Sequence, residues 1–340
     1  MTHESPVPTS VVFGQLQHLV DYLSKLVRLE GQVHEVASTG HHAPQPVGRL
    51  HTAGWLFLFD CGEGTQRQMM RFGVGFTVEA IFVTHLHADH YLGITGLLRT
   101  MTLQDRTEPI AIWGPPSSKE RLALVVELGG DRIGFPVQIG ELAPGEEILQ
   151  DGFAIRAFRT RHTSDSIGFT LEEQRRLGRF DVDRARDSGV PEGPLFGALH
   201  RGDPVDLPDG RVVRPEDVVG PSRPGRKLVY TGDTGPDQGV VDAAEAADLL
   251  IHESTFSRDE RERARRTGHS TAEDAARTAK QAGVRELVLT HLSARYSEQP
   301  EQLEKESRAI FRPSRVAHDG LVVQVPFRPD EDVAHPAHRG

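Results

Sequence analysis

The chain has 340 residues, enough for one large domain or two smaller ones, and 37% of them are hydrophobic. No apolar run reaches the length of a membrane span, and the first residues lack the basic region and apolar core of a secretory signal. The single cysteine, Cys61, excludes an intramolecular disulfide and a cysteine-based zinc site. We therefore expect a cytoplasmic protein with no membrane contact. The net charge of −10 argues against an extended nucleic-acid surface, so an anionic substrate would need a local patch or a metal.

The first 50 residues form an atypical segment. Residues 1–9 are polar, and the apolar residues between 15 and 30 follow helical spacing, which predicts an amphipathic helix over 15–30. Residues 38–51 contain glycine, proline and histidine and predict a loop. Its adjacent His41 and His42 lack the spacing of metal ligands, which favours surface positions for both.

From residue 51 onward, short apolar runs alternate with helical patterns. Strands are expected near 55–60, 81–83, 110–113, 153–158, 228–231, 248–252, 286–290 and 320–325, and helices near 65–72, 92–103, 118–128, 271–282 and 298–311. This alternation predicts layered α/β packing over 51–326, followed by a polar tail at 327–340. Cys61 is expected to be a packed small residue rather than a nucleophile.

The segment 172–226 interrupts this alternation. It contains seven prolines and little apolar periodicity, which predicts that it has no core of its own. Residues 172–227 carry eleven basic and eleven acidic side chains, so the negative charge resides in the rest of the chain. An insertion of this length is usually either functional or a linker, although a surface elaboration without a role is the alternative.

The most informative stretch is Thr84-His85-Leu86-His87-Ala88-Asp89-His90. It follows an apolar strand-like run and precedes a helical pattern, which is where α/β folds collect ligands. Imidazole and carboxylate suit zinc or manganese, so the pattern indicates a metal site rather than a solvated polar turn.

Three later residues complete a ligand set. His162, Asp233 and His291 each lie just beyond an apolar strand, and strand ends of one sheet lie side by side. Seven candidate ligands exceed the four that one zinc takes, which indicates two metals with one bridging carboxylate. Two such metals activate a shared water as hydroxide and hold the oxygens of an in-line displacement at phosphorus.

Two further residues have catalytic potential. His269 opens a helix, where it could meet a phosphate or transfer a proton, and Glu253 could orient it. A purely structural role is the alternative, because helix capping explains part of the Gly268-His269-Ser270-Thr271 pattern.

Taken together, these motifs resemble the metallo-β-lactamase superfamily and, within it, the ribonuclease Z family of tRNA 3′-end-processing endonucleases. The resemblance runs from about Trp55 to Val325 and rests on motif order and spacing. The matching stretches are F-D-C-G-E-G-T-Q-R-Q, H-L-H-A-D-H, R-T-R-H-T-S-D-S-I-G-F, G-P-L-F-G-A-L-H-R-G, Y-T-G-D-T, I-H-E-S-T, G-H-S-T and L-T-H-L-S-A-R-Y.

The resemblance implies a four-layer αββα sandwich with two zinc ions, or manganese, at one edge. One metal would be held by His85, His87 and His162, the other by Asp89, His90 and His291, with Asp233 bridging. Asp89 would also be the general base, while Glu253 and His269 would assist proton transfer to the leaving group.

The resemblance further implies a substrate and an assembly. A metal-bound hydroxide would cut precursor tRNA after the discriminator base, leaving a 3′-hydroxyl on the tRNA. Residues 172–226 would be the flexible exosite arm that grips the tRNA body, and the protein would be a homodimer. The front of the chain departs from the family, since Ser38-Thr39-Gly40 and Pro46-Val47-Gly48-Arg49 match its first turn and substrate loop only in part.

Two other functions fit the same residues. A related hydrolase could use the metal site on a small phosphodiester, sulfate ester or thioester, and it would not need residues 172–226. A non-catalytic RNA-binding relative is the third reading, and the complete ligand set argues against it.

Overall fold

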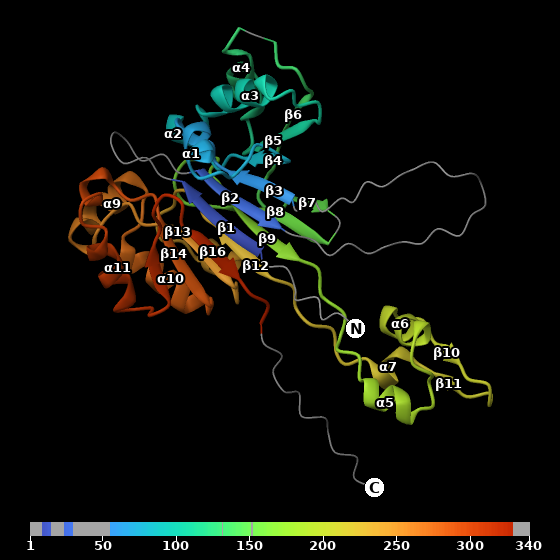
Figure 1. Ribbon diagram of the computed structural model, residues 1–340. Coiled ribbons are helices and arrows are strands. Elements are labelled where there is room, and N and C mark those ends of the chain that lie inside the picture. The colour runs from blue at the N-terminus through green and yellow to red at the C-terminus, as the bar shows by residue number, and fades with distance from the viewer. Residues whose placement is uncertain (1–8, 15–23, 30–54, 131, 151, 329–340) are drawn as a thin grey trace. The chain divides into compact units, whose positions relative to one another are not determined.

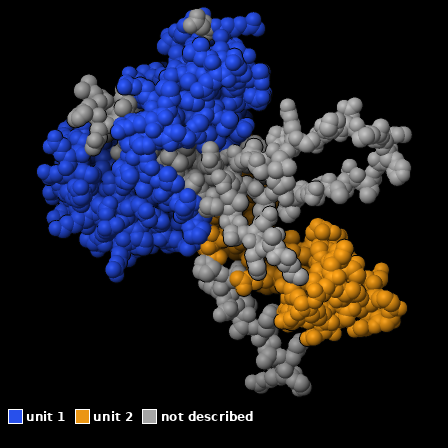
Figure 2. Space-filling view, viewed as in Figure 1, with its two compact units in different colours: residues 1–149, 155–171, 227–326 blue, residues 150–154, 172–226, 327–340 orange. Residues whose placement is uncertain are grey.

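The computed structural model of the protein describes residues 9–14, 24–29, 55–130, 132–150 and 152–328. The chain divides into two compact units, coloured separately in Figure 2. Unit 1 comprises residues 1–149, 155–171 and 227–326, and unit 2 comprises 150–154, 172–226 and 327–340.

The first sheet of unit 1 has seven strands in the order β16-β1-β2-β3-β4-β5-β6 (Figure 1). Their bounds are β1 (Thr9–Gly14), β2 (Ser24–Leu29), β3 (Trp55–Phe59), β4 (Ala80–Phe82), β5 (Ile110–Gly114), β6 (Val137–Glu141) and β16 (Val322–Val325). Strands β3 to β6 run parallel, whereas β16, β1 and β2 are joined in antiparallel pairs.

The second sheet also has seven strands, in the order β15-β14-β13-β12-β9-β8-β7. Their bounds are β7 (Glu147–Gln150), β8 (Phe153–Arg159), β9 (Ile167–Glu173), β12 (Lys227–Tyr230), β13 (Leu249–Glu253), β14 (Glu286–Thr290) and β15 (Ser314–Val316). Strands β12 to β15 are parallel, so their carboxyl ends lie at one edge.

Helices cover the outer face of each sheet. The first sheet packs against α1 (Thr65–Arg71), α2 (Ala88–Tyr91), α3 (Ile94–Leu103) and α4 (Lys119–Glu127). The second sheet is accompanied by α8 (Gln238–Ala243), α9 (Arg261–Thr267), α10 (Ala272–Ala282) and α11 (Glu301–Arg308), with 3-10 turns at Arg258–Glu260 and Ala294–Tyr296 (Figure 1). The small residues of α10, an alanine-rich helix, let it lie close to β13 and β14.

The strand alternation explains why two cores form on the two faces of the first sheet. Leu56 and Leu58 of β3 join the core under the helices. Phe59, which follows Leu58 in β3, faces the second sheet instead, where its ring centroid lies 5.7 Å from that of Phe169 and 5.9 Å from that of Tyr230. Because successive strand residues point to opposite faces, one run of apolar residues serves both layers. The expected αββα sandwich is confirmed.

One expected element is wrong. Residues 24–29 form strand β2, which pairs with β1 and β3, where the sequence predicted a helix over 15–30. The apolar residues of this short run fit both the helical and the strand periodicity. Pairing with two neighbouring strands selects the strand. Residues 15–23 and 30, the predicted loop at 38–51 with His41 and His42, and both partial family motifs lie outside the described residues.

Unit 2 has a core, contrary to expectation. It contains α5 (Val182–Asp187), α6 (Pro194–Arg201), β10 (Val205–Asp206), β11 (Val212–Val213) and α7 (Pro215–Val218). These short elements bury Ala185, Val190, Leu199, Val205, Leu207, Val213 and Val218 against one another. Prolines and glycines divide the apolar residues into pieces too short to show periodicity, so the cluster forms only through tertiary contacts.

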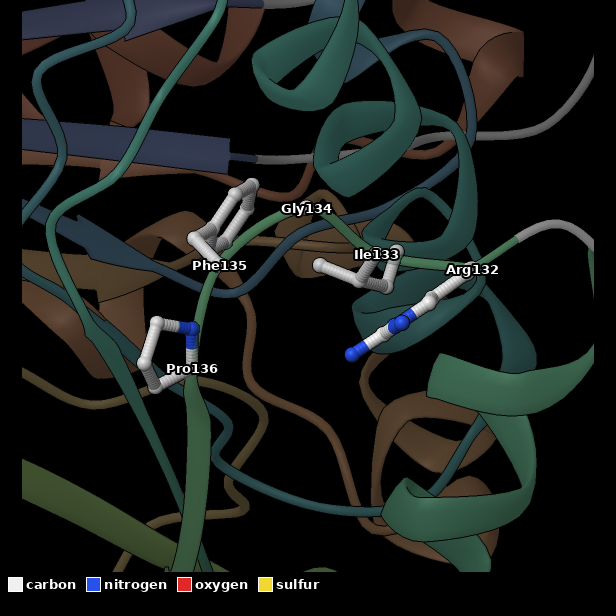
Figure 3. Close-up of a pocket in the computed structure, with 5 residues that line it drawn as sticks. All are labelled: Arg132, Ile133, Gly134, Phe135 and Pro136. Carbon is white, nitrogen blue, oxygen red and sulfur yellow. The ribbon is translucent and has the colours of Figure 1, made fainter.

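Unit 1 has a surface pocket of about 600 Å³, lined by Arg132, Ile133, Gly134, Phe135 and Pro136 at the turn before β6 (Figure 3). None of the predicted site residues lines it. Cys61 is fully buried in the core of the first sheet, which confirms its predicted packing role. None of the helices in the described part of the chain has the length and hydropathy of a transmembrane segment.

Candidate metal centre

All the predicted ligands follow strand ends of unit 1. The loop with His85 and His87 leaves β4, His162 follows β8, Asp233 follows β12, and His291 follows β14. Short apolar strands end where the chain turns polar, so the polar residues gather at the carboxyl edge.

The first group of donor atoms comprises His85, His87, His162 and Asp233. His87 Nδ1 lies 2.9 Å from His85 Nε2 and 3.1 Å from His162 Nε2. Asp233 Oδ2 lies 3.7 Å from the Nε2 atoms of both His85 and His162. Three imidazole nitrogens and one carboxylate oxygen therefore face a common point.

The second group comprises Asp89, His90 and His291. Asp89 Oδ2 lies 3.4 Å from His90 Nε2 and 3.6 Å from His291 Nε2. Asp233 links the two groups, since its Oδ2 is 3.5 Å from His90 Nε2 and its Oδ1 is 3.4 Å from His291 Nε2. The structure thus brings together all seven predicted ligands.

In four of the histidine ligands, the Nδ1 atom faces away from the cluster and has a hydrogen-bond acceptor. His90 Nδ1 donates to Asp60 Oδ2 at 2.8 Å, and His162 Nδ1 donates to the Gly268 carbonyl at 3.0 Å. His291 Nδ1 lies 2.9 Å from Thr255 Oγ1, and His85 Nδ1 lies 3.1 Å from Thr84 Oγ1. Donation at Nδ1 leaves the Nε2 lone pair directed into the cluster, as a metal ligand requires.

Three buried atoms at the centre support a cation. His90 Nε2, His291 Nε2 and Asp233 Oδ1 have no hydrogen-bond partner among the described residues. An unpaired buried polar atom is costly, and coordination would satisfy all three. The donor set of imidazoles and carboxylates, with outer partners in place, therefore fits divalent cations such as zinc or manganese.

The charges of the site agree with this fit. Burial raises the pKa of Asp233, but His291 and His90 outweigh it and hold that pKa well below its usual value. Burial likewise lowers the pKa of His291, but the nearby Asp233 and Asp89 carboxylates outweigh it and raise the pKa to about 9. The carboxylates thus draw protons onto nearby rings, and a bound cation would replace those protons.

Glu253 and His269 form a hydrogen-bonded pair beside the ligands. His269 Nδ1 donates to Glu253 Oε1 at 2.7 Å. The buried Glu253 carboxylate also accepts from the backbone amides of Thr234, Thr255 and Ser270 and from the Thr255 hydroxyl. Burial lowers the pKa of His269, but the charge and hydrogen bond of Glu253 outweigh it and raise that pKa. Thr271 makes the capping bond of α10, so helix capping accounts for part of this stretch, as the alternative supposed.

Sequence reasoning missed Asp60. Its buried carboxylate accepts hydrogen bonds from His90, from the Tyr230 hydroxyl at 2.6 Å and from the Thr84 amide at 2.8 Å. It lies just after β3, so the strand-end signal that identified Asp233 was also present at Asp60. Its left-handed backbone, with φ of 58°, turns the chain there.

A model of the β-lactamase superfamily domain matches residues 56–179 and 210–292. A ribonuclease Z from Myxococcus xanthus is 55% identical over 274 residues, covering 80% of this chain and 89% of the relative. A ribonuclease Z from Haloferax volcanii is 51% identical over 276 residues, covering 81% and 87%.

A crystal structure of the short form of human tRNase Z is similar in fold. Its TM-score is 0.62 at 25% identity, and the match covers 94% of this chain and all of the human one. A long form of ribonuclease Z from yeast gives a TM-score of 0.59 at 18% identity, covering 94% of this chain and 42% of the yeast chain. The second likeness concerns the fold alone.

Proposed function

The chain belongs to the ribonuclease Z family of the β-lactamase superfamily, and from that membership we propose that it is an endoribonuclease that removes the 3′ trailer from precursor tRNA. Two observations together carry the proposal. The structure has two adjoining groups of donor atoms, and ribonuclease Z relatives match about four fifths of the chain at about 50% sequence identity. The cut would leave a 3′-hydroxyl on the tRNA.

Two zinc ions, or manganese, are the proposed cofactors. His85, His87 and His162 would hold one, Asp89, His90 and His291 the other, and Asp233 would bridge them. When bound, such a pair supplies Lewis acidity that activates water and stabilises charge on the phosphoryl oxygens.

Asp89 is the proposed general base. Burial raises its pKa, but the nearby His291 and His90 rings outweigh it and hold the pKa well below its usual value, so the group is a carboxylate at neutral pH. It is partly exposed, unlike Asp233, so a water entering the site can reach it. Asp89 would orient that water and accept its proton as oxygen adds to phosphorus.

His269 is the proposed general acid. Glu253 keeps the His269 ring protonated. His269 would transfer that proton to the 3′ oxygen as the bond from phosphorus to this oxygen breaks. Glu253 acts through His269 and is therefore a positioning residue. Five hydrogen bonds to its carboxylate keep it ionised and oriented.

We further propose that residues 172–226 form an arm that grips the tRNA body, that two copies of the chain form a homodimer, and that the protein acts in the cytoplasm. The arm's own core supports a folded binding element. Arginines on its surface, including Arg175, Arg179 and Arg201, offer contacts for phosphates.

The test uses a precursor tRNA with a short 3′ trailer and a small chromogenic phosphodiester. The full chain, loaded with zinc or manganese, should release the trailer and yield a tRNA ending in a 3′-hydroxyl. A variant with 174–225 replaced by a short glycine-serine linker should keep turnover of the small ester and lose that of the tRNA. Lack of cleavage by fully loaded protein would refute the function, and a replacement that leaves both activities unaffected would favour a small-molecule hydrolase.

A further inference from the structure

Unit 2 is connected to strands β9 and β12 by two antiparallel segments, 173–181 and 218–226, which we call the stem. Arg176 and Arg223 exchange backbone hydrogen bonds of 2.7 and 2.9 Å across it. The backbones approach so closely that a Cβ atom at Gly178 would collide with the facing strand. A lone two-stranded ribbon is marginally stable in water, so the shape of the stem depends on what packs against it.

A third chain segment contributes the packing. Phe327, separated from β16 only by Pro326, places its ring centroid 3.7 Å from Cζ of Arg176 and 4.2 Å from Cζ of Arg226. The same ring therefore contacts one guanidinium from each strand of the stem.

Charge explains why the ring is effective there. Arg176 and Arg226 carry like charges on opposite strands, and the Glu173 carboxylate accepts a hydrogen bond from Arg226 Nε at 2.8 Å. Arg226 is only 4% exposed, so its interaction with the π face is weakly screened by water. Phe327 thus attracts one cationic side chain from each strand and stabilises the paired stem.

We propose that Phe327 is a positioning residue for RNA capture: by clamping the stem it restricts the conformations of the stem and so strengthens binding of substrates that contact the arm. The RNA part rests on the proposed function of residues 172–226. The clamp itself is a property of the stem and can be measured separately.

The experiment compares the metal-loaded full chain with Phe327→Ala, Phe327→Tyr and Phe72→Ala. Phe72 is the matched control, because it is a partly exposed phenylalanine with one arginine, Arg71, 5.4 Å from its ring. Hydrogen exchange of the Arg176 and Arg223 amides measures the stem. Steady-state kinetics on precursor tRNA and on a small phosphodiester measure function.

We expect Phe327→Ala to speed exchange of both amides and to raise KM for precursor tRNA, each by about tenfold. The kcat for tRNA and the turnover of the small ester should not change. Phe327→Tyr, which keeps the π face, should restore exchange and KM, and Phe72→Ala should leave both at wild-type values.

Unchanged exchange in Phe327→Ala would overturn the clamp. Faster exchange with an unchanged KM would overturn the positioning role. If the wild-type chain leaves precursor tRNA intact, the proposed function and the RNA part of this inference both fail, and exchange alone then decides whether the clamp exists.

Discussion

Replacing Asp60 by asparagine tests the metal centre through a residue that is not a ligand. Asparagine has the same shape and tolerates the left-handed backbone at this position, where φ is 58°. Asp60 Oδ1 accepts from the Thr84 amide, while Oδ2 accepts from His90 Nδ1 and Tyr230. The amide oxygen can keep the Thr84 bond, but the NH₂ group then faces His90.

The expected consequence is a change of tautomer. His90 Nδ1 cannot donate to an NH₂ group, so the ring's proton moves to Nε2, the atom that faces Asp89 and Asp233. A protonated Nε2 cannot ligate. Loss of an outer partner costs about 10- to 100-fold in metal affinity, which corresponds to about 1.4–2.8 kcal/mol.

Competition against a fluorescent chelator measures this loss for zinc or manganese. In Asp60→Asn, the affinity for one of the two metal equivalents should fall by that factor, because His90 belongs to the second group. The affinity for the other equivalent should change little. Tyr230→Phe is the control, since it removes one hydrogen bond to Asp60 and leaves the acceptor of His90 in place. Two equivalents bound by Asp60→Asn with wild-type affinity would refute the reasoning.

Three further predictions follow from other parts of the molecule. Glu253→Gln should lower kcat by about 10²- to 10⁴-fold. Because Glu253 raises the pKa of His269, and His269 must be protonated to act as the acid, the alkaline limb of the kcat–pH profile should move to lower pH. An alkaline limb that does not move would contradict this. Leu199→Ala, at a fully buried position of unit 2, should cost about 2–5 kcal/mol and expose the amides of unit 2 to exchange while turnover of a small phosphodiester persists. Burial raises the pKa of the Cys61 thiol, so iodoacetamide should label it only after denaturation, as followed by mass spectrometry.

The sequence predicts which residues gather at this edge of the sheets because their signal is local. An apolar run that ends in His or Asp marks a strand end, and parallel strands bring such ends together, as at Asp233 and His291. The same argument could have included Asp60. However, a residue that only accepts a hydrogen bond from a ligand has no characteristic spacing in the sequence. Its role becomes visible only when His90 is seen 2.8 Å away.

The secondary-structure predictions fail where contacts between distant parts of the chain determine the structure. Residues 24–29 contain apolar residues at positions that suit a helix or a strand, and pairing with β3 selects the strand. Strand β9 went unpredicted because apolar and polar residues mix within 167–173, although its inward residues pack on the first sheet. The core of unit 2 likewise joins residues separated by turns, which no local window detects.

Both donor groups draw on the two sheets of unit 1. His85, His87, Asp89 and His90 follow β4 of the first sheet, whereas His162, Asp233 and His291 follow strands of the second. A cation in either group would therefore connect the two layers of the sandwich, and part of its binding free energy would oppose their separation. Chelation should then lower the melting temperature of the chain as well as its activity, so that cation supply would govern how long the enzyme persists in its folded form.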